Sequence, residues 1–225
     1  MSGTVIHQGA EIGMSRSRHA SPLAIATLGP AGTSSEVAAE FLAERLRRPP
    51  EDRASIRLCD TYEQAAQMII KRSAQLLIVA NAYAGISRFY MNPQFCLAAA
   101  FVRDTPPYGL AARDDGGQLK RVRVATHPAP EPLIAELLPA EYQLDAVLLV
   151  NSTSAAAAAV RSGAADLALT TAPAASAYGL RFLSRTRTIR MLWSVFARRD
   201  LVRAGPERPA TRSRYPVTSP SRSSR

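Results

Sequence analysis

The chain has 225 residues, of which 47% are hydrophobic, and a formal net charge of +10. This length and apolar content can bury one sizeable core or the cores of two small lobes, which excludes a wholly disordered protein. No run approaches the roughly 20 apolar residues of a membrane-spanning helix, and residues 1–22 lack the apolar core of a signal peptide, so we expect a cytoplasmic protein that does not contact membranes.

The positive charge is concentrated at the ends of the chain. Residues 201–225 carry six Arg and one Glu, and residues 1–22 carry two Arg and one Glu, which leaves +4 for residues 23–200. Neither end shows apolar periodicity, so we predict a disordered N-terminal segment and a disordered basic tail. Because the sequence contains no nucleic-acid-binding signature and no glycine-rich nucleotide loop, we expect no specific binding of nucleic acid.

The two cysteines, Cys59 and Cys96, are too few and too isolated for a disulfide framework or a zinc site. We expect both to be buried structural thiols. The sequence therefore predicts neither a metal site nor a cofactor.

Residues 23–36 (LAIATLGPAGTSSE) read as a strand that runs into the start of a helix. After the Gly-Pro pair, Gly32 lets the backbone approach a ligand, and Thr33 and Ser34 place hydroxyls at the helix start. The first N–H groups of a helix lack internal partners, and the helix dipole adds positive potential there. This junction predicts an anion site, although Ser and Thr are also ordinary N-caps.

The first half of the chain alternates between strand-like and helical runs. The strand-like runs IATL, SIRLC and LLIVA are separated by helical runs at 35–48 and 62–72. This βαβαβ order predicts a parallel sheet with helices on its faces. Two extended segments, 95–103 and 108–113, then flank the sequence Asp-Thr-Pro-Pro, and they indicate a passage of the chain from one lobe to another.

The second half resumes the alternation. The strand-like runs RVRVATH, AVLLV, DLALT and LRFL alternate with helical runs near 131–138, at 152–161 and at 172–178. The last strand, 189–198 (IRMLWSVFAR), is expected to return to the first lobe. We therefore predict an α/β fold of two lobes around a central cleft.

The predicted lobe I comprises about residues 23–104 and 188–200, and lobe II comprises about residues 105–187. A second hydroxyl-lined helix start lies in lobe II, where Asn151, Ser152 and Thr153 follow the strand-like LDAVLLV. Ligands of open parallel sheets bind at the carboxyl ends of strands, where both helix starts would lie. Two such starts facing one cleft predict a ligand with two carboxylates.

The order of GPAGTSSEVAAEF, NSTSAAAAAV and AYGLRFL before the last strand resembles the catalytic domain of prephenate dehydratases, over about Leu23 to Asp200. The resemblance implies a two-lobed fold like that of type II periplasmic binding proteins. Those enzymes make phenylpyruvate from prephenate by expelling the ring carboxylate and the ring hydroxyl together. The resemblance therefore implies that prephenate is the small-molecule partner of this chain.

The chain departs from the dehydratases at two of their motifs. Their Thr-Arg-Phe motif on the last strand supplies the proton donor to the leaving hydroxyl, and alignment places Met191-Leu192-Trp193 there. A thioether cannot donate a proton. Their Glu-Asn-Ser run after the third strand is replaced by a segment that includes Asn81 and Tyr83.

A narrower family shares these departures. The stretches AYAGISRFYMNP, FVRDTPPYGLAAR, VNSTSAAAAAV and IRMLWSVFARRD resemble the prephenate decarboxylases of bacilysin-type and related cyclohexenyl amino acid biosynthesis. This resemblance implies a carboxy-lyase that removes carbon dioxide from prephenate without aromatising the ring, so that the product is a dihydro-4-hydroxyphenylpyruvate. Resemblance also suggests a homodimer.

The chemistry of this reaction assigns roles to candidate residues. Met191 would withhold the acid that the ring hydroxyl needs in order to leave, and such an acid is typically worth about 10² to 10⁴ in rate. Tyr83 and His127 are candidate donors of the ring proton, and an ordered water or the substrate's own hydroxyl are the other sources. The expected substrate-binding residues, at the two helix starts and among nearby polar and basic groups, are Gly32, Thr33, Ser34, Asn81, Arg88, Arg103, Asn151, Ser152 and Thr153.

Several of these residues also have an ordinary structural interpretation. Tyr83 can be a packing residue, and His127 can cap the helix that follows it. Arg88 can be a solvated loop residue, and Arg103 can form an ion pair with Asp104.

Two other functions compete with decarboxylation. The first is an ordinary dehydratase with a rearranged acid, for which Ser194 is the best surrogate donor. The second is a non-catalytic module that binds a small carboxylate, since two-lobed clefts of this type also serve as solute-binding and effector domains.

Overall fold

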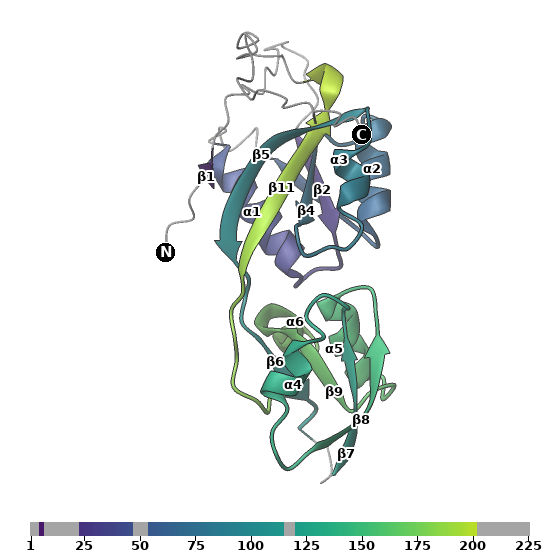
Figure 1. Ribbon diagram of the computed structural model, residues 1–225, viewed down its shortest axis with the longest axis vertical. Helices are drawn as coiled ribbons and strands as arrows, with labels where there is room; N and C mark the ends of the chain where they lie inside the picture. Colours follow the sequence, from purple (N-terminus) through teal and green to yellow (C-terminus); the bar gives the residue numbers. More distant parts are fainter. Residues whose placement is uncertain (1–4, 7–22, 47–53, 115–119, 202–225) are drawn as a thin grey trace, which may run out of the picture.

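The computed structural model describes residues 5–6, 23–46, 54–114 and 120–201. The disorder predicted for the two ends falls almost entirely on residues outside this described part. Within the described part, the chain forms two lobes, each built on one β-sheet (Figure 1). The predicted two-lobed α/β fold is therefore confirmed.

Lobe I is a six-stranded sheet in the order β1-β5-β11-β4-β2-β3. Its strands are β1 (Val5–Ile6), β2 (Ala24–Leu28), β3 (Ser55–Cys59), β4 (Leu76–Ala80), β5 (Phe95–Asp104) and β11 (Arg190–Arg198). Strands β2, β3 and β4 run parallel, and β11 lies antiparallel between β4 and β5. The last long strand thus returns to the middle of the first sheet, and a short 3-10 turn (Arg199–Leu201) follows it.

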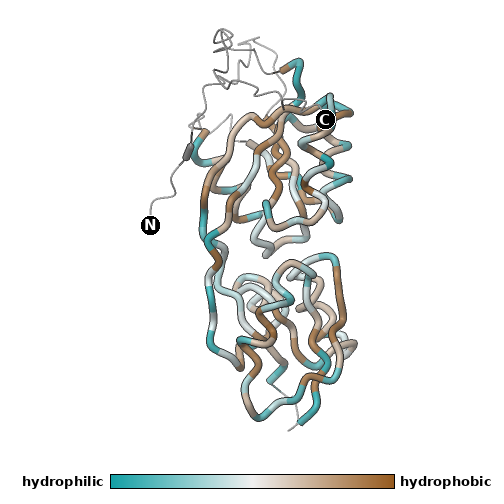
Figure 2. The backbone as a smooth tube through the Cα atoms, in the orientation of Figure 1, coloured by the Kyte–Doolittle hydropathy of each residue, from teal (hydrophilic) through white to brown (hydrophobic). Residues whose placement is uncertain are grey.

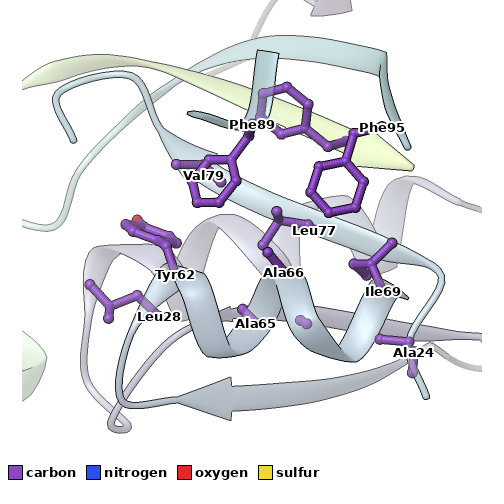
Figure 3. Packing of buried hydrophobic residues seen from close by; sticks show 13 residues of the cluster. Ala24, Leu28, Tyr62, Ala65, Ala66, Ile69, Leu77, Val79, Phe89 and Phe95 are labelled. Carbon is purple, nitrogen blue, oxygen red and sulfur yellow. The ribbon is translucent and has the colours of Figure 1, made fainter. Parts of the chain in front are cut away.

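Helices cover both faces of the lobe I sheet. They are α1 (Ser34–Arg45), α2 (Tyr62–Ile70) and the short α3 (Ser87–Tyr90). Alternate residues of β2 and β4 pack against α1 on one face and against α2 on the other, as the two-residue period of a strand requires. Figure 3 shows the α2 face, where Ala66 and Ile69 lie beneath Leu77 and Phe95.

Lobe II is a five-stranded sheet in the order β10-β6-β9-β7-β8. Its elements are β6 (Tyr108–Ala112), β7 (Arg121–Thr126), α4 (Leu133–Leu137), β8 (Gln143–Leu149), α5 (Thr153–Arg161), β9 (Leu167–Thr171), α6 (Ala172–Ala177) and β10 (Arg181–Phe182). Buried alanines of α5 and α6 pack closely on β7 and β9. Figure 2 shows hydrophobic residues along the central strands of lobe I and along β8 at the edge of the lobe II sheet.

None of the helices in the described ranges is long and apolar enough to cross a membrane. Cys59 and Cys96 are free thiols, as expected, but they are half-buried rather than buried.

The chain passes between the lobes twice, and the two passages lie side by side (Figure 1). The Thr105 N–H donates to the Ile189 carbonyl at 2.9 Å, and the Ile189 N–H donates to Thr105 Oγ1 at 3.1 Å. Tyr108 and Arg187 exchange two backbone hydrogen bonds of 2.8 Å. The hinge is therefore a hydrogen-bonded pair of extended segments and not two independent linkers.

A second contact joins the lobes at the loop before α1. The Ser154 hydroxyl donates to the Ala31 carbonyl at 2.8 Å, and the Thr171 hydroxyl donates to the Gly32 carbonyl at 2.9 Å. Gly32 has a φ of +86°, and a Cβ there would lie 3.2 Å from the backbone of Ala174 in α6. Only glycine allows this loop to lie so close to lobe II in this backbone conformation.

We expect Gly32→Ala to lower the free energy of unfolding by about 1–3 kcal/mol, because the added methyl group meets both an unfavourable φ and the backbone of α6. Gly179→Ala is the matched control, since Gly179 has a φ of +64° but nothing within 4 Å of an added Cβ. Urea denaturation of both variants should show the larger loss for Gly32→Ala. Equal losses would mean that the contact with α6 adds nothing.

Candidate active site

A cavity of about 500 Å³, a volume that includes its open mouth, lies between the lobes. Lobe I contributes the ends of β2 and β4, the starts of α1, α2 and β11, and the segment after β4. Lobe II contributes the start of β6, the loop after β7 and the start of α5.

The cavity brings together most of the predicted site residues from distant parts of the sequence. Those that line it are Thr33, Ser34, Tyr83, His127, Ser152, Thr153 and Met191. Asn151 lines an adjoining hollow at the mouth, beside Asp60 and Glu63. Gly32, Asn81, Arg88 and Arg103 line neither space.

The two predicted helix starts both reach the cavity, and both are also capped. Thr33 Oγ1 accepts a hydrogen bond from the Glu36 N–H at 3.2 Å, and Ser152 Oγ accepts one from the Ala155 N–H at 3.0 Å. The capping and the ligand-binding interpretations therefore coexist, because each cap occupies one N–H of its helix and the preceding first-turn N–H groups lack intrahelical partners. The Gly32 N–H is donated to the Glu36 carboxylate at 2.6 Å, so the backbone at Gly32 is engaged by the protein itself.

Two buried tyrosine hydroxyls that were not predicted complete the α1 side of the cavity. Tyr62 Oη lies 2.8 Å from Ser35 Oγ, and Tyr108 Oη of lobe II lies 3.2 Å from Ser34 Oγ. Burial raises the pKa of Tyr62 to about 12 and also raises the pKa of Tyr108, so both phenols stay protonated at neutral pH. A sequence signal existed for Tyr62 alone, which follows the carboxyl end of a predicted strand.

Tyr83 lines the cavity, and its hydroxyl hydrogen is donated to another residue of the protein. Its Oη donates to Glu63 Oε1 at 2.6 Å, and Arg88 Nη1 lies 3.5 Å from the same carboxylate oxygen. Burial and this hydrogen bond raise the pKa of Tyr83 to about 12. The ring also lies over Gly85, where an added Cβ would come within 2.6 Å of it.

His127 lines both the cavity and the adjoining hollow. Its Nδ1 accepts a hydrogen bond from the Ala129 N–H at 3.3 Å, which leaves the proton of the neutral ring on Nε2. Burial lowers the pKa of His127, so the imidazole is neutral at pH 7. Among the described lining residues, it is the one whose ordinary pKa lies near neutrality.

Met191 lines the cavity at the start of β11, whereas Ser194, three residues further along, does not. Ser194 Oγ donates to Asn81 Oδ1 at 2.8 Å and lies 2.6 Å from Tyr90 Oη. The hydroxyl proposed as a surrogate dehydratase acid is thus engaged outside the cavity, and so is the Asn81 amide oxygen.

The Arg103 guanidinium lies 4.4 Å above the Phe41 ring, on the α1 side of the lobe I sheet. No ion pair with Asp104 forms among the described residues, and the buried Arg103 Nε lacks a hydrogen-bond partner there. Of the described residues that line the cavity and its adjoining hollow, none is Lys or Arg. Hydroxyls, helix N–H groups and one imidazole therefore provide the polar surface of the cavity.

The arrangement of the two lobes matches solved structures of one class. A prephenate dehydratase in complex with L-Phe from Arthrobacter aurescens superposes with a TM-score of 0.57 at 16% identity, over 78% of this chain and 60% of that chain. A periplasmic substrate-binding protein of an ABC transporter from Coxiella burnetii gives 0.52 at 13% identity, over 79% and 85%. The fold is thus that of prephenate dehydratases and type II periplasmic binding proteins.

Sequence similarity narrows this class to one family. The prephenate decarboxylase of Bacillus amyloliquefaciens is 38% identical over 183 residues, which cover 80% of this chain and 88% of that protein. The prephenate decarboxylase of Planktothrix agardhii is 37% identical over 183 residues, or 80% and 90%. No general family model matches the chain. The chain belongs to the prephenate decarboxylase family.

The lowered pKa of His127 predicts a loss of stability in mild acid. Between its folded pKa and the ordinary value near 6.5, the unfolded chain binds more protons than the folded protein, so the free energy of unfolding falls as the pH falls. His127→Gln should flatten this dependence, by at most about 1.4 kcal/mol per pH unit.

Urea denaturation between pH 7.5 and 5 measures the effect, with the other titrating groups shared by both proteins. Parallel stability curves for the two proteins would contradict the assignment of a half-buried, neutral His127.

Proposed function

We infer that the protein removes the ring carboxylate of prephenate as carbon dioxide and leaves the ring hydroxyl in place. The observation that carries this inference, beside membership of the family, is the thioether of Met191 in the cavity, since the sequence resemblance aligns the segment that starts at Met191 with the motif that holds the dehydratase acid. A thioether cannot protonate the hydroxyl, and hydroxide is a poor leaving group unless it is protonated. No observation favours dehydration or simple ligand binding instead.

We propose that the start of α1 holds the pyruvyl carboxylate. Ser34 and Ser35 place hydroxyls there, and the N–H groups of the first turn have no intrahelical partners. Ser152 and Thr153 then contact the same arm from lobe II. None of the described residues that line the cavity is Lys or Arg. The carboxylate is therefore bound by the dipoles of hydroxyls and helix N–H groups rather than by full positive charges.

The ring carboxylate loses its charge as it becomes carbon dioxide, so apolar surroundings favour the transition state over the bound substrate. Leu28, Met191 and Trp193 provide apolar wall in the cavity. The electron pair of the broken carbon–carbon bond moves into the ring and shifts one alkene, and a proton adds at the far allylic carbon. The reaction thus consumes one proton and releases one molecule of carbon dioxide.

For this proton we propose His127 rather than Tyr83. The Tyr83 hydrogen is held by Glu63 at 2.6 Å, and its pKa of about 12 opposes its loss. The Nε2 proton of His127 has no acceptor among the described residues, and a bound dianion raises the affinity of the imidazole for a second proton. Water and the substrate's own hydroxyl are the alternative sources.

A homodimer, a cytoplasmic location and a place in bacilysin-like secondary metabolism stay predictions from the sequence.

Incubation of the purified protein with prephenate near neutral pH tests the reaction. We expect release of one carbon dioxide per substrate and a product whose NMR spectrum keeps the alkene and carbinol signals of a non-aromatic ring. A reaction without protein controls for spontaneous aromatisation. Phenylpyruvate as the enzymatic product, or no turnover, would overturn the proposed function.

We expect Met191→Thr to create at most slight dehydratase activity. Threonine restores a hydroxyl at that position, but the segment around Asn81 and Tyr83 also departs from the dehydratases, and Ser194 remains bonded to Asn81. Leu192→Thr is the matched control, because Leu192 is the next residue of β11 and does not line the cavity. Ultraviolet absorbance of phenylpyruvate measures the change, and abundant phenylpyruvate from Met191→Thr would show that this one position decides the outcome.

A further inference from the structure

Ser35 and Tyr62 form a hydrogen-bonded pair at the cavity wall. Ser35 is the second residue of α1 and is 5% exposed, and Tyr62 is the first residue of α2 and is 3% exposed. Their hydroxyl oxygens lie 2.8 Å apart, and both residues line the cavity. The Ala80 N–H at the end of β4 donates to Tyr62 Oη at 3.2 Å.

The chemistry of the two hydroxyls favours one direction for the hydrogen bond. A phenol has one hydrogen to donate, and the neighbours of Tyr62 Oη are the Ala80 N–H, which is itself a donor, and Ser35 Oγ. Because a phenol is the stronger acid and an aliphatic hydroxyl is the better acceptor, we take Tyr62 as the donor to Ser35. Its pKa of about 12 keeps that hydrogen in place at neutral pH.

The orientation leaves the Ser35 hydrogen without an acceptor among the described residues. A buried hydroxyl whose hydrogen has no acceptor is unfavourable by itself, so this geometry suits a site that is completed by a ligand. The chain of donors runs from the Ala80 N–H through Tyr62 and Ser35 into the cavity.

The Tyr90–Ser194 pair shows what a purely structural pair of the same chemistry looks like. Its oxygens lie 2.6 Å apart, and Ser194 passes its hydrogen on to Asn81 Oδ1 at 2.8 Å. That pair ends on a protein acceptor and does not line the cavity, whereas the Tyr62–Ser35 pair ends at the cavity.

We propose that Ser35 is a substrate-binding residue that donates its hydroxyl hydrogen to the pyruvyl carboxylate, and that Tyr62 is the positioning residue that aims it. This inference rests on the proposed function for the identity of the substrate. The acceptor is an anion, because the Ser35 hydroxyl lies in the first turn of α1, where helix N–H groups and the dipole favour negative charge.

Kinetics of carbon dioxide release should separate the two roles. We expect Ser35→Ala to raise KM roughly 10- to 100-fold, the range for a lost hydrogen bond to a charged group, with kcat nearly unchanged because the pyruvyl carboxylate does not react. Tyr62→Phe keeps the ring and should raise KM roughly 3- to 10-fold. The double variant should be no worse than Ser35→Ala, because Tyr62 acts only through Ser35.

Tyr90→Phe is the matched control, since it removes the same phenol–serine hydrogen bond outside the cavity and should leave KM unchanged. Thermal unfolding of all four variants checks that each is folded under the assay conditions. Additive effects of Ser35→Ala and Tyr62→Phe, or an unchanged KM for folded Ser35→Ala, would overturn the proposal.

Calorimetric binding of phenylpyruvate supplies a readout that does not need turnover. This compound carries the pyruvyl arm but lacks the ring carboxylate, so Ser35→Ala should weaken its binding by the same factor as it raises KM. Unchanged phenylpyruvate binding would overturn the assignment to the pyruvyl carboxylate. Failure of the wild-type protein to release carbon dioxide would instead overturn the proposed function, while phenylpyruvate binding still tests Ser35.

Discussion

The cleft depends on the close contact between the loop before α1 and lobe II. Two lobe II hydroxyls hold the carbonyls of Ala31 and Gly32, and Gly32 supplies the backbone conformation that lets them approach. Because these carbonyls bond to lobe II, the start of α1 is held against the lobe that carries α5. The starts of α1 in lobe I and α5 in lobe II are thereby fixed around one cavity. The hinge, which consists of two hydrogen-bonded extended segments, is a separate connection between the lobes.

The groups that line the cavity, and those that are missing from its lining, both bear on the proposed reaction. Its described lining offers hydroxyls, an imidazole and aromatic rings, but no Asp, Glu, Lys or Arg. Such a surface can orient a dianion through hydrogen bonds, and in the proposed reaction the thioether of Met191 has no proton to give to the ring hydroxyl. Ser194, a hydroxyl close by on the same strand, is engaged by Asn81 and Tyr90 outside the cavity.

Local sequence patterns predicted the fold well. The alternation of strand-like and helical runs predicted two sheets, and the capped junctions at Thr33 and Ser152 begin α1 and α5 as expected. These features follow from the periodicity of apolar residues and from the unpaired N–H groups of a helix start. Both depend only on residues that are close together in the sequence. The site was less predictable, because the direction of a side chain depends on tertiary packing. Arg88 forms an ion pair with Glu63, and Arg103 stacks on Phe41, so neither lines the cavity.

The position of β11 has a consequence for how the protein is made. Lobe II is one continuous stretch, so its sheet can assemble as soon as that stretch leaves the ribosome. The lobe I sheet is completed later, because β11, which lies between β4 and β5, is synthesised after all the strands of lobe II in the described residues. The same strand brings Met191 and Trp193 to the cavity. During synthesis, the cavity between the lobes is therefore complete only after β11 has joined the lobe I sheet.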